Sequence, residues 1–224
     1  QYEILFCIQD ENDKSIPIVK KLMKEYPNAD SKLFIGGEDS IRNPKIRNMI
    51  PGYNASKYPL ILISDSGIKM LPEALTDMVG SMRDDVALCT QIPYCENREG
   101  RGPKVEQMYF GTAHARIYLA GNLLRFVCST GMSSMMRRTA LDECGGLLHF
   151  GKYLAEDYFI GCAVKEKGWS TSLASLPAIQ NSGSVTLESY DARISRWVKL
   201  RYKMLQHIIV VEPLQVYSNF NYLF

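Results

Sequence analysis

The stretch Leu60-Ile61-Leu62-Ile63-Ser64-Asp65-Ser66-Gly67 decides the fold class of this chain. Its first four residues are large and apolar, and two of them are β-branched, which indicates a short strand buried on both faces. The strand ends in a Ser-Asp-Ser-Gly turn, so Asp65 is expected at the carboxyl end of a central strand, the edge where open α/β sheets bind ligands. Its carboxylate suits a divalent cation or a ribose hydroxyl. An Asx-turn, or a cap for the next helix, is the alternative role.

Strands and helices alternate through the first half of the chain. Apolar runs predict strands over residues 2–8, 32–35, 60–64 and 86–90. The segments between them predict a helix capped by Ser15, a helix that starts at Asn43 and is interrupted near Pro51-Gly52, and a helix over residues 72–82. This order predicts an α/β fold with a mixed, mostly parallel central sheet flanked by helices. No GxGxxG follows the first strand and no GxxxxGK[ST] is present, so the phosphate-binding glycines of dinucleotide Rossmann and P-loop proteins are missing.

The second half of the chain has a less regular pattern. It predicts, in order, a loop over residues 91–103, a long helix over 105–124, a strand over 132–136, a short helix from 139, a helix over 154–167, a strand over 170–173, a loop over 177–184 and a last helix over 188–206. No linker divides the chain. We therefore expect one domain over residues 1–207, followed by an apolar, aromatic segment over residues 208–224.

Composition narrows the class of protein. The chain has 224 residues, 46% hydrophobic and 22% charged, which is typical of a globular domain with a sizeable core. The formal net charge of +2 is too small to indicate nucleic-acid binding. No apolar run is long enough to span a bilayer, and the first residues of the chain do not have the pattern of a signal peptide. Because residue 1 falls just before a strand and the chain ends in an apolar stretch, we expect a piece of a longer protein. The six cysteines form no CxxC pair, which favours reduced, packed thiols.

The last predicted helix carries Arg193, Arg196 and Trp197. Residues spaced i, i+3 and i+4 share one helix face, so two guanidinium groups and an indole are expected side by side. The planar fork of arginine suits phosphate oxygens, and the indole adds a flat wall, so a nucleotide diphosphate is a natural ligand. The alternative is a solvated basic face next to a membrane, with the tryptophan anchored in the core.

Three further groups could carry chemistry. Asp13 lies in the loop after the first predicted strand. Asp157 lies in the first turn of a predicted helix, where carboxylates ordinarily stabilise the helix dipole and where a catalytic base would also be held rigidly. His114 lies on the long predicted helix with Tyr109 and Tyr118 nearby. It is interpreted either as a satisfied, partly buried histidine or as a contact for an acceptor substrate.

The end of the chain has the composition of a membrane interface. Five basic residues and no acidic ones occur from Arg193 to Lys203. Apolar residues 208–211 and aromatic residues at 217, 220, 222 and 224 follow. A basic helix that leads into an apolar, aromatic segment suits the headgroup boundary of a lipid membrane. A lipid substrate could then enter laterally, with the long helix at residues 105–124 lining the entrance.

Taken together, these residues resemble a known pattern. Asp13, Asp65, Asp157 and Arg193-x-x-Arg196-Trp197 are similar to the Asp, Asp, Asp, (Gln/Arg)-x-x-Arg-Trp pattern of inverting, membrane-bound glycosyltransferases with the GT-A fold. The likeness is strongest to the ceramide glucosyltransferase family and runs from end to end. Further matching segments are Leu33–Gly37, Asn43–Lys45, Pro51–Tyr53, Asp65–Ile68, Gly131–Ser133, Ala155–Phe159 and Gln180–Gly183.

The resemblance implies transfer of glucose from UDP-glucose to the primary hydroxyl of ceramide, with inversion, by an enzyme in the Golgi membrane whose catalytic domain faces the cytosol. It implies that Asp13 lies in the nucleotide pocket, Asp65 at the sugar-nucleotide and metal site, and that Asp157 is the catalytic base. It also implies that the Arg/Trp face holds the diphosphate and shapes the acceptor site. All these groups are then expected to converge on one sugar-diphosphate at the carboxyl edge of the sheet.

One departure from the family pattern concerns the metal, Mg²⁺ or Mn²⁺. The usual DxD motif is Asp65-Ser66-Gly67 in this chain, with a single carboxylate. Other ligands would have to be water, UDP oxygens or another side chain. Two alternatives to ceramide glucosylation stay open. One is a processive polysaccharide synthase of the same superfamily, and the other is a non-catalytic nucleotide-binding module that docks on a membrane.

Overall fold

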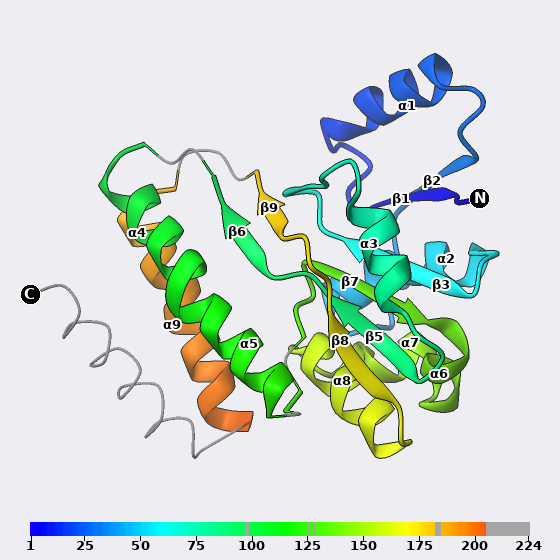
Figure 1. The fold of residues 1–224 in the computed structure, drawn as a ribbon. Helices are drawn as coiled ribbons and strands as arrows, with labels where there is room; N and C mark the ends of the chain where they lie inside the picture. The colour runs from blue at the N-terminus through cyan, green and yellow to red at the C-terminus, as the bar shows by residue number, and fades with distance from the viewer. Residues whose placement is uncertain (97–98, 125, 128, 182–184, 205–224) are drawn as a thin grey trace, which may run out of the picture. The chain divides into compact units, whose positions relative to one another are not determined.

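The computed structural model has a mixed α/β fold and describes residues 1–96, 99–124, 126–127, 129–181 and 185–204 (Figure 1). Backbone contacts divide the chain into two compact units, which we call unit 1 and unit 2. Unit 1 holds residues 1–63, 81–89 and 134–172, and unit 2 holds residues 64–80, 90–133 and the described residues after 172. Both units are built from segments that alternate along the chain, which explains why no linker divides the sequence. The segment 208–224 and its boundary lie outside the described residues.

Unit 1 contains two sheets and most of the predicted helices. Its strands are β1 (Ile4–Ile8), β2 (Ser31–Ile35), β3 (Leu60–Ser64), β5 (Val86–Thr90), β7 (Ser133–Arg137) and β8 (Ser170–Leu173). Its helices are α1 (Ser15–Glu25), α2 (Pro44–Ala55), α6 (Arg138–Glu143), α7 (Gly146–His149), the 3₁₀ turn η2 (Phe150–Lys152) and α8 (Glu156–Glu166). β1 and β2 form a parallel pair in which Ile4 lies opposite Ser31 and Ile8 opposite Ile35. The other four strands form a sheet in the order β3-β7-β5-β8.

The position of β3 corrects one prediction. Residues 60–64 do form a strand, but it lies at an edge of its sheet, and its apolar residues are only half-buried. The strand with every residue buried is β5 (Val86–Thr90), which has neighbours on both sides. A short apolar run identifies a strand but does not distinguish an edge from a centre, because that depends on which distant strand pairs with it.

The core of unit 1 forms where α2, α6, α7 and α8 pack against β5 and β7. Ile46 of α2 is fully buried there, together with Phe150, Leu147 and Ile160 from the second half of the chain. This burial of large apolar side chains stabilises unit 1. The cysteines that the structure describes are free thiols, as predicted, at positions 7, 89, 95, 144 and 162.

Helix α2 runs unbroken through Pro51, where an interruption was predicted. A proline within a helix cannot donate to the carbonyl four residues earlier, which is that of Arg47. In this chain the Arg47 carbonyl accepts a hydrogen bond from the Glu38 N–H at 3.2 Å instead. The next residue, Gly52, lets α2 approach β1 closely, because a Cβ there would lie 2.6 Å from the Cys7 Sγ. A distant backbone donor therefore satisfies the group that Pro51 leaves unbonded.

Unit 2 contains a small mixed sheet and a set of packed helices. Its strands are β4 (Ile68–Lys69), β6 (Pro93–Cys95) and β9 (Ala178–Gln180). Its helices are α3 (Ala74–Ser81), α4 (Arg101–Tyr109), the π-helical turn η1 (Phe110–His114), α5 (Ala115–Leu123) and α9 (Leu187–Met204). β9 is central, parallel to β6 and antiparallel to β4. β6 and β9 lie in segments predicted as loops, and α4 begins at Arg101, inside the first of those loops.

The long helix predicted over residues 105–124 is interrupted by the π-helical turn between α4 and α5. α9 packs beside α4 in unit 2 (Figure 1). The π turn inserts an extra residue per turn and so changes which side chains face the neighbouring helix, a change often found at functional sites. None of the helices in the described ranges is long and apolar enough to cross a membrane.

Candidate active site

A polar pocket of about 330 Å³ lies at the carboxyl ends of β1 and β2 in unit 1. Its walls come from the loop after β1, the loop after β2 and the side of α2. The Gly36 N–H donates to the Ile8 carbonyl at 2.9 Å, and Gly36 has a φ of 81°, which lets the chain turn away at the end of β2. The lining residues are Gln9, Glu11, Ile35, Gly36, Gly37, Asp39 and Arg47.

The glycine loop of this pocket is fixed to helix α2. A Cβ on Gly37 would lie 2.7 Å from the Arg47 carbonyl oxygen, so the close approach requires glycine. The Arg47 guanidinium in turn donates to the Ile41 carbonyl from Nε at 3.1 Å and from Nη2 at 2.9 Å. The pocket wall is therefore held by backbone contacts, and it offers amide, carboxylate and guanidinium groups to a polar ligand.

Asp13 lies two residues before the first residue of α1. Its Oδ1 accepts a hydrogen bond from the Ser15 N–H at 2.8 Å, and this contact lowers the pKa of the exposed Asp13 carboxyl. The prediction that Ser15 caps the helix is wrong, because Ser15 is already the first helical residue. Asp13 belongs to the same loop as the pocket residues Gln9 and Glu11 but does not itself line the pocket. A direct contact between Asp13 and a nucleotide stays a prediction.

Asp157 lies in the first turn of α8, as predicted, and is half-buried. Its Oδ1 accepts a hydrogen bond from the Tyr158 N–H at 2.8 Å. Helix N-termini stabilise negative charge, so this position favours an ionised carboxylate on a rigid element.

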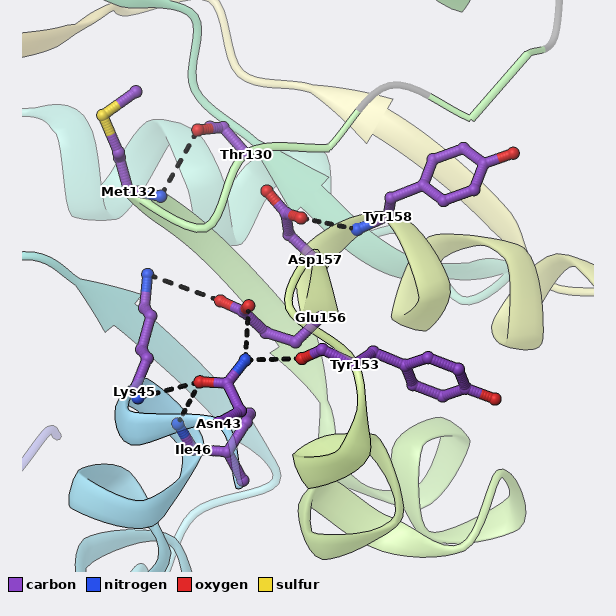
Figure 2. Close-up of polar contacts among 9 residues, drawn as sticks. All are labelled: Asn43, Lys45, Ile46, Thr130, Met132, Tyr153, Glu156, Asp157 and Tyr158. Atoms are coloured by element: carbon purple, nitrogen blue, oxygen red, sulfur yellow. Dashed lines mark hydrogen bonds and ion pairs between the residues drawn. The ribbon is translucent and has the colours of Figure 1, made fainter. Parts of the chain in front are cut away.

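A buried polar network supports the start of α8 (Figure 2). The Asn43 side-chain N–H groups donate to the Tyr153 carbonyl at 2.7 Å and to Glu156 Oε2 at 3.0 Å. Lys45 Nζ lies 3.8 Å from Glu156 Oε1. Burial, and then the nearby Asp157, raises the pKa of Glu156. The sequence marks Asn43 as a helix start and as part of a segment that matches the family, but not as a partner of α8, because its contacts with residues more than a hundred positions away leave no local signal.

Asp65 follows β3 directly and belongs to unit 2. Its turn is held by backbone hydrogen bonds from segments far apart in the chain. The Asp65 N–H donates to the Met132 carbonyl at 2.9 Å, and the Asn181 N–H donates to the Gly67 carbonyl at 2.7 Å. The turn itself closes through the Ile68 N–H, which donates to the Asp65 carbonyl at 3.0 Å. The half-buried carboxylate is therefore carried on a well-fixed turn.

The donor set around Asp65 can be compared with the needs of a metal ion. Among the residues that the structure describes, no group of three or more His, Cys, Asp or Glu side chains could hold one. Mg²⁺ in phosphate-binding sites often takes only one or two carboxylates and completes its shell with phosphate oxygens and water. The single Asp65 carboxylate fits such a cation, which would bind together with a diphosphate rather than as a resident ion.

Unit 2 brings together most of the residues predicted to contact donor and acceptor. The Trp197 ring centroid lies 6.0 Å from that of Phe110 and 6.1 Å from that of His114. His114 also lies 5.6 Å from Tyr109 and 4.8 Å from Tyr118. Figure 1 shows the helices that carry these rings, α4 with its continuation α5, and α9. The predicted acceptor residues and Trp197 therefore form one aromatic cluster.

The two predicted diphosphate arginines have different surroundings. Arg193 forms an ion pair with Glu106, and its guanidinium carbon lies 5.6 Å from the ring centroids of both Phe110 and Trp197. Glu106 is fully buried, and sequence reasoning missed it. Arg196 is exposed on the same helix. The charge of Arg193 is therefore largely balanced within unit 2, whereas Arg196 presents its charge at the surface.

His114 is buried and neutral. Only 7% of its surface is exposed, and burial, assisted by the positive charge of Arg201, lowers the pKa of His114 from 6.5 to about 4. Its Nδ1 has no hydrogen-bond partner within the described part of the chain. A neutral imidazole with an unused ring nitrogen can accept a hydrogen bond, for example from a hydroxyl group. His114 is therefore a buried histidine with one nitrogen left without a partner in the described residues, and its contact with an acceptor stays a prediction.

The predicted site residues divide between the units. Asp13 and Asp157 belong to unit 1, whereas Asp65 and the Arg/Trp face belong to unit 2. Their convergence on a single ligand stays a prediction. Within each unit the chemistry is consistent: a polar pocket and a carboxylate at a helix start in one, and a carboxylate turn and a cationic, aromatic cluster in the other.

Comparison with known proteins identifies the family. The chain matches Glycosyl transferase family 21 over residues 1–219. It is 56% identical over 217 residues to Ceramide glucosyltransferase 3 and 51% identical over 216 residues to Ceramide glucosyltransferase 1, both from Caenorhabditis elegans. These alignments cover 96% of the chain and 47% and 46% of the two relatives. Ceramide glucosyltransferase of Komagataella phaffii is 25% identical over an alignment of 271 residues, gaps included. The alignment covers 95% of the chain and 53% of that relative. The chain thus spans about half the length of the curated relatives it matches. The match agrees with the predicted GT-A-like fold class, and the chain belongs to Glycosyl transferase family 21.

Proposed function

We propose that this chain forms the catalytic part of an enzyme that transfers glucose from UDP-glucose to the primary hydroxyl of ceramide, giving β-linked glucosylceramide. The observation that carries the proposal is the similarity, at 56% and 51% identity over 96% of the chain, to two proteins named ceramide glucosyltransferase. We further propose that the enzyme works in the Golgi membrane with this part facing the cytosol.

The polar pocket of unit 1 is a suitable site for the nucleotide of the donor. The Gln9 amide, the Glu11 and Asp39 carboxylates and the Arg47 guanidinium line it, and Gly36, which has open space at its Cβ position, lets a ligand approach the backbone. Uracil and ribose carry both hydrogen-bond donors and acceptors, which such a mixed set of groups can satisfy. Asp13 lies in the loop that supplies Gln9 and Glu11, which supports its role beside the nucleotide.

Asp157 is the proposed catalytic base. Inversion at the anomeric carbon requires the ceramide hydroxyl to attack from the face opposite the departing UDP. An unaided alcohol is a poor nucleophile, and a positioned carboxylate that takes its proton accelerates such a step by roughly 10²–10⁴-fold. The first turn of α8 gives Asp157 a rigid position and favours its ionised form.

The departing UDP gathers negative charge that the protein must stabilise. Arg196, exposed on α9, and Arg193 beside Trp197 are the proposed cationic groups. A preorganised electrostatic contact of this kind contributes about 2.7–4 kcal/mol to transition-state stabilisation. Mg²⁺ or Mn²⁺ held by Asp65 and the diphosphate would supply further positive charge when bound.

The aromatic cluster of unit 2 is the proposed acceptor side of the site. The free Nδ1 of neutral His114 can accept a hydrogen bond from a hydroxyl of the acceptor, between Tyr109 and Tyr118. The same helices expose large apolar side chains, including Met108, Leu119, Leu123, Val198 and Tyr202. Apolar side chains combined with the basic residues of α9 suit the surface of a lipid membrane, from which ceramide would enter.

The test is an acceptor assay with the full-length protein in membranes. Radiolabelled UDP-glucose is supplied with a short-chain ceramide or with free sugars, with and without a chelator. We expect a single labelled glycolipid with ceramide, little product with sugars, and a loss of rate with the chelator that added Mg²⁺ or Mn²⁺ restores. A labelled sugar polymer would indicate a polysaccharide synthase. Donor binding without transfer to any acceptor would indicate a non-catalytic module.

A further inference from the structure

A buried asparagine joins the start of α2 to the start of α8, next to Asp157. Only 3% of Asn43 is exposed, and its side chain makes four hydrogen bonds. Its Oδ1 accepts from the N–H groups of Lys45 at 2.8 Å and Ile46 at 3.1 Å. Its Nδ2 donates to the Tyr153 carbonyl at 2.7 Å and to Glu156 Oε2 at 3.0 Å (Figure 2).

These four contacts use the full hydrogen-bonding capacity of a carboxamide, two donors and two acceptor sites. The acceptor half caps α2, a role that Ser, Thr or Asp could also fill. The Nδ2 group donates two hydrogen bonds to the segment that leads into α8. Neither Ser nor an ionised Asp has two N–H groups to donate at that position. The choice of Asn is therefore explained by α8 rather than by α2.

We propose that Asn43 is a positioning residue for Asp157 and acts through Glu156. Asn43 donates hydrogen bonds to Tyr153, before α8 begins, and to Glu156, the first residue of α8. These two bonds fix the position of the adjacent Asp157. The proposal rests on the proposed role of Asp157 as the catalytic base.

The hydrogen bonds around Glu156 affect charge as well as the position of Asp157. Glu156 is 8% exposed and faces Lys45 from α2, the Asn43 amide, and Asp157 on its own helix. The hydrogen bond from Asn43 and the charge of Lys45 favour the ionised form, while burial and Asp157 raise the pKa of Glu156. Because neighbouring carboxylates repel each other, the charge at position 156 affects how readily Asp157 binds a proton.

The first experiment compares Asn43→Asp with Asn48→Asp in the full-length protein. Asn48 is a matched control on the same helix, because its Nδ2 donates to the Cys7 carbonyl at 2.8 Å rather than to the α8 segment. Asn43→Asp keeps the cap of α2 but loses both donors and puts a carboxylate beside Glu156. Asn43→Ser loses the same donors without adding charge. We expect both Asn43 variants to lower kcat per folded molecule by about 10²-fold with little change in KM for UDP-glucose, as misplaced catalytic groups do.

The second experiment uses Glu156→Gln, which keeps an oxygen for Asn43 but removes the charge. We expect the acid limb of its kcat/KM–pH profile to move to lower pH by about one unit, because one like charge next to the base is lost. A merely structural role would change the amplitude of the profile and leave its midpoint in place. An unmoved midpoint, or Asn43 variants with wild-type kcat, would overturn the proposal.

Amide hydrogen exchange tests the same contact without catalysis. We expect exchange at residues 153–158 to be faster in both Asn43 variants and unchanged in Asn48→Asp. If ceramide is not the acceptor, the exchange experiment still decides, because it needs no transfer activity. Unchanged exchange at the start of α8 would contradict the positioning role whatever the outcome of the ceramide assay.

Discussion

Asp157 is the residue on which the proposed chemistry most depends. Its replacement by Asn preserves shape but removes the proton acceptor. We expect Asp157→Asn to lower transfer by roughly 10²–10⁴-fold or more, the usual contribution of a general base. UDP-glucose affinity, measured by titration calorimetry, should be retained because the base contacts the acceptor hydroxyl. Near-normal turnover in this variant would remove Asp157 from the mechanism.

Arg193 is expected to have a structural role in addition to its proposed role beside the diphosphate, whereas Arg196 is expected to affect catalysis alone. Arg193→Ala leaves the buried Glu106 carboxylate without its ion pair, which costs on the order of 3 kcal/mol in denaturant unfolding, the low end for such pairs because Arg193 is partly exposed. Arg196→Ala removes an exposed charge and should lower kcat more than donor affinity, with little change in unfolding.

The control for this prediction replaces both partners of the ion pair. Glu106→Leu combined with Arg193→Leu removes the charge as well as its partner, so it should recover most of the stability that Arg193→Ala loses. If Arg193→Ala unfolds like wild type, the pair does not stabilise unit 2. If Arg196→Ala weakens donor binding and turnover equally, Arg196 only anchors the ground state.

Residue-level prediction from sequence succeeded where the signal is local. The carboxylate at the start of α8 is predicted from a short motif and confirmed. The predicted Ser15 cap is wrong, because Ser15 is the first helical residue and its N–H donates to Asp13. The partners of Arg193 and of Asn43 were not predictable. Glu106 and Glu156 are separated from them by many residues, and nothing in a single sequence reports which buried charges meet.

The packing of α2 against β1 gives a prediction at the scale of elements. A Cβ at Gly52 would lie 2.6 Å from the Cys7 Sγ, whereas Gly80 in α3 has open space around it. Gly-to-Ala changes in helices ordinarily stabilise by up to about 1 kcal/mol. We expect Gly80→Ala to raise the unfolding free energy by this amount and Gly52→Ala to lower it by about 1–3 kcal/mol through overpacking.

Removing the sulfur should reverse the effect of the extra methyl group. Gly52→Ala combined with Cys7→Ala has room for the new Cβ. The double variant should therefore lose much less unfolding free energy than the losses of the two single variants added together. Thermal and denaturant unfolding of the single and double variants measure this coupling. Simple additivity would show that α2 shifts away from β1 at little cost.

The π-helical turn between α4 and α5 carries a pH prediction. The pKa of His114 is 6.5 in its ordinary state and about 4 in the folded protein, so between these values the unfolded chain binds more protons. Stability from burying the neutral ring is therefore present above pH 6.5 and is lost as the pH falls towards 4. The loss is on the order of 3 kcal/mol when complete.

His114→Phe keeps a ring in the aromatic cluster and cannot take up a proton. Its unfolding free energy should therefore fall less steeply than that of wild type between pH 6.5 and 4, while the two slopes agree above pH 7. His149 is exposed, so His149→Phe is a suitable control that should follow wild type. Parallel slopes for His114→Phe and wild type would show that His114 is not buried as a neutral ring.

At the scale of elements, the sequence predicted the type and order of most helices and strands. The prediction failed where a strand partner or a hydrogen-bond donor comes from a segment far away in the sequence. β9 lies in a segment predicted as a loop, because its three residues become a strand only between β4 and β6. α2 was expected to break at Pro51, but the Glu38 N–H satisfies the carbonyl that the proline leaves. Both features depend on tertiary contacts that local propensity does not contain.

At the scale of the whole molecule, the end-to-end resemblance and the matched family agree over residues 1–219. The division into two interleaved units was not predicted, because each unit collects segments that are separated in sequence. The proposed activity distributes its groups over both units, with the nucleotide pocket and base in one and the carboxylate turn and aromatic cluster in the other. We therefore expect variants in either unit to impair the same transfer reaction.

The most direct measurement is the structure of the product that the full-length enzyme makes from UDP-glucose and a short-chain ceramide. Proton NMR of the purified glycolipid gives both the attachment point and the anomeric configuration. Direct displacement of UDP by the ceramide hydroxyl predicts a single glucose, β-linked to the primary hydroxyl. An α-linked glucose, a sugar polymer or free glucose as the main product would contradict it.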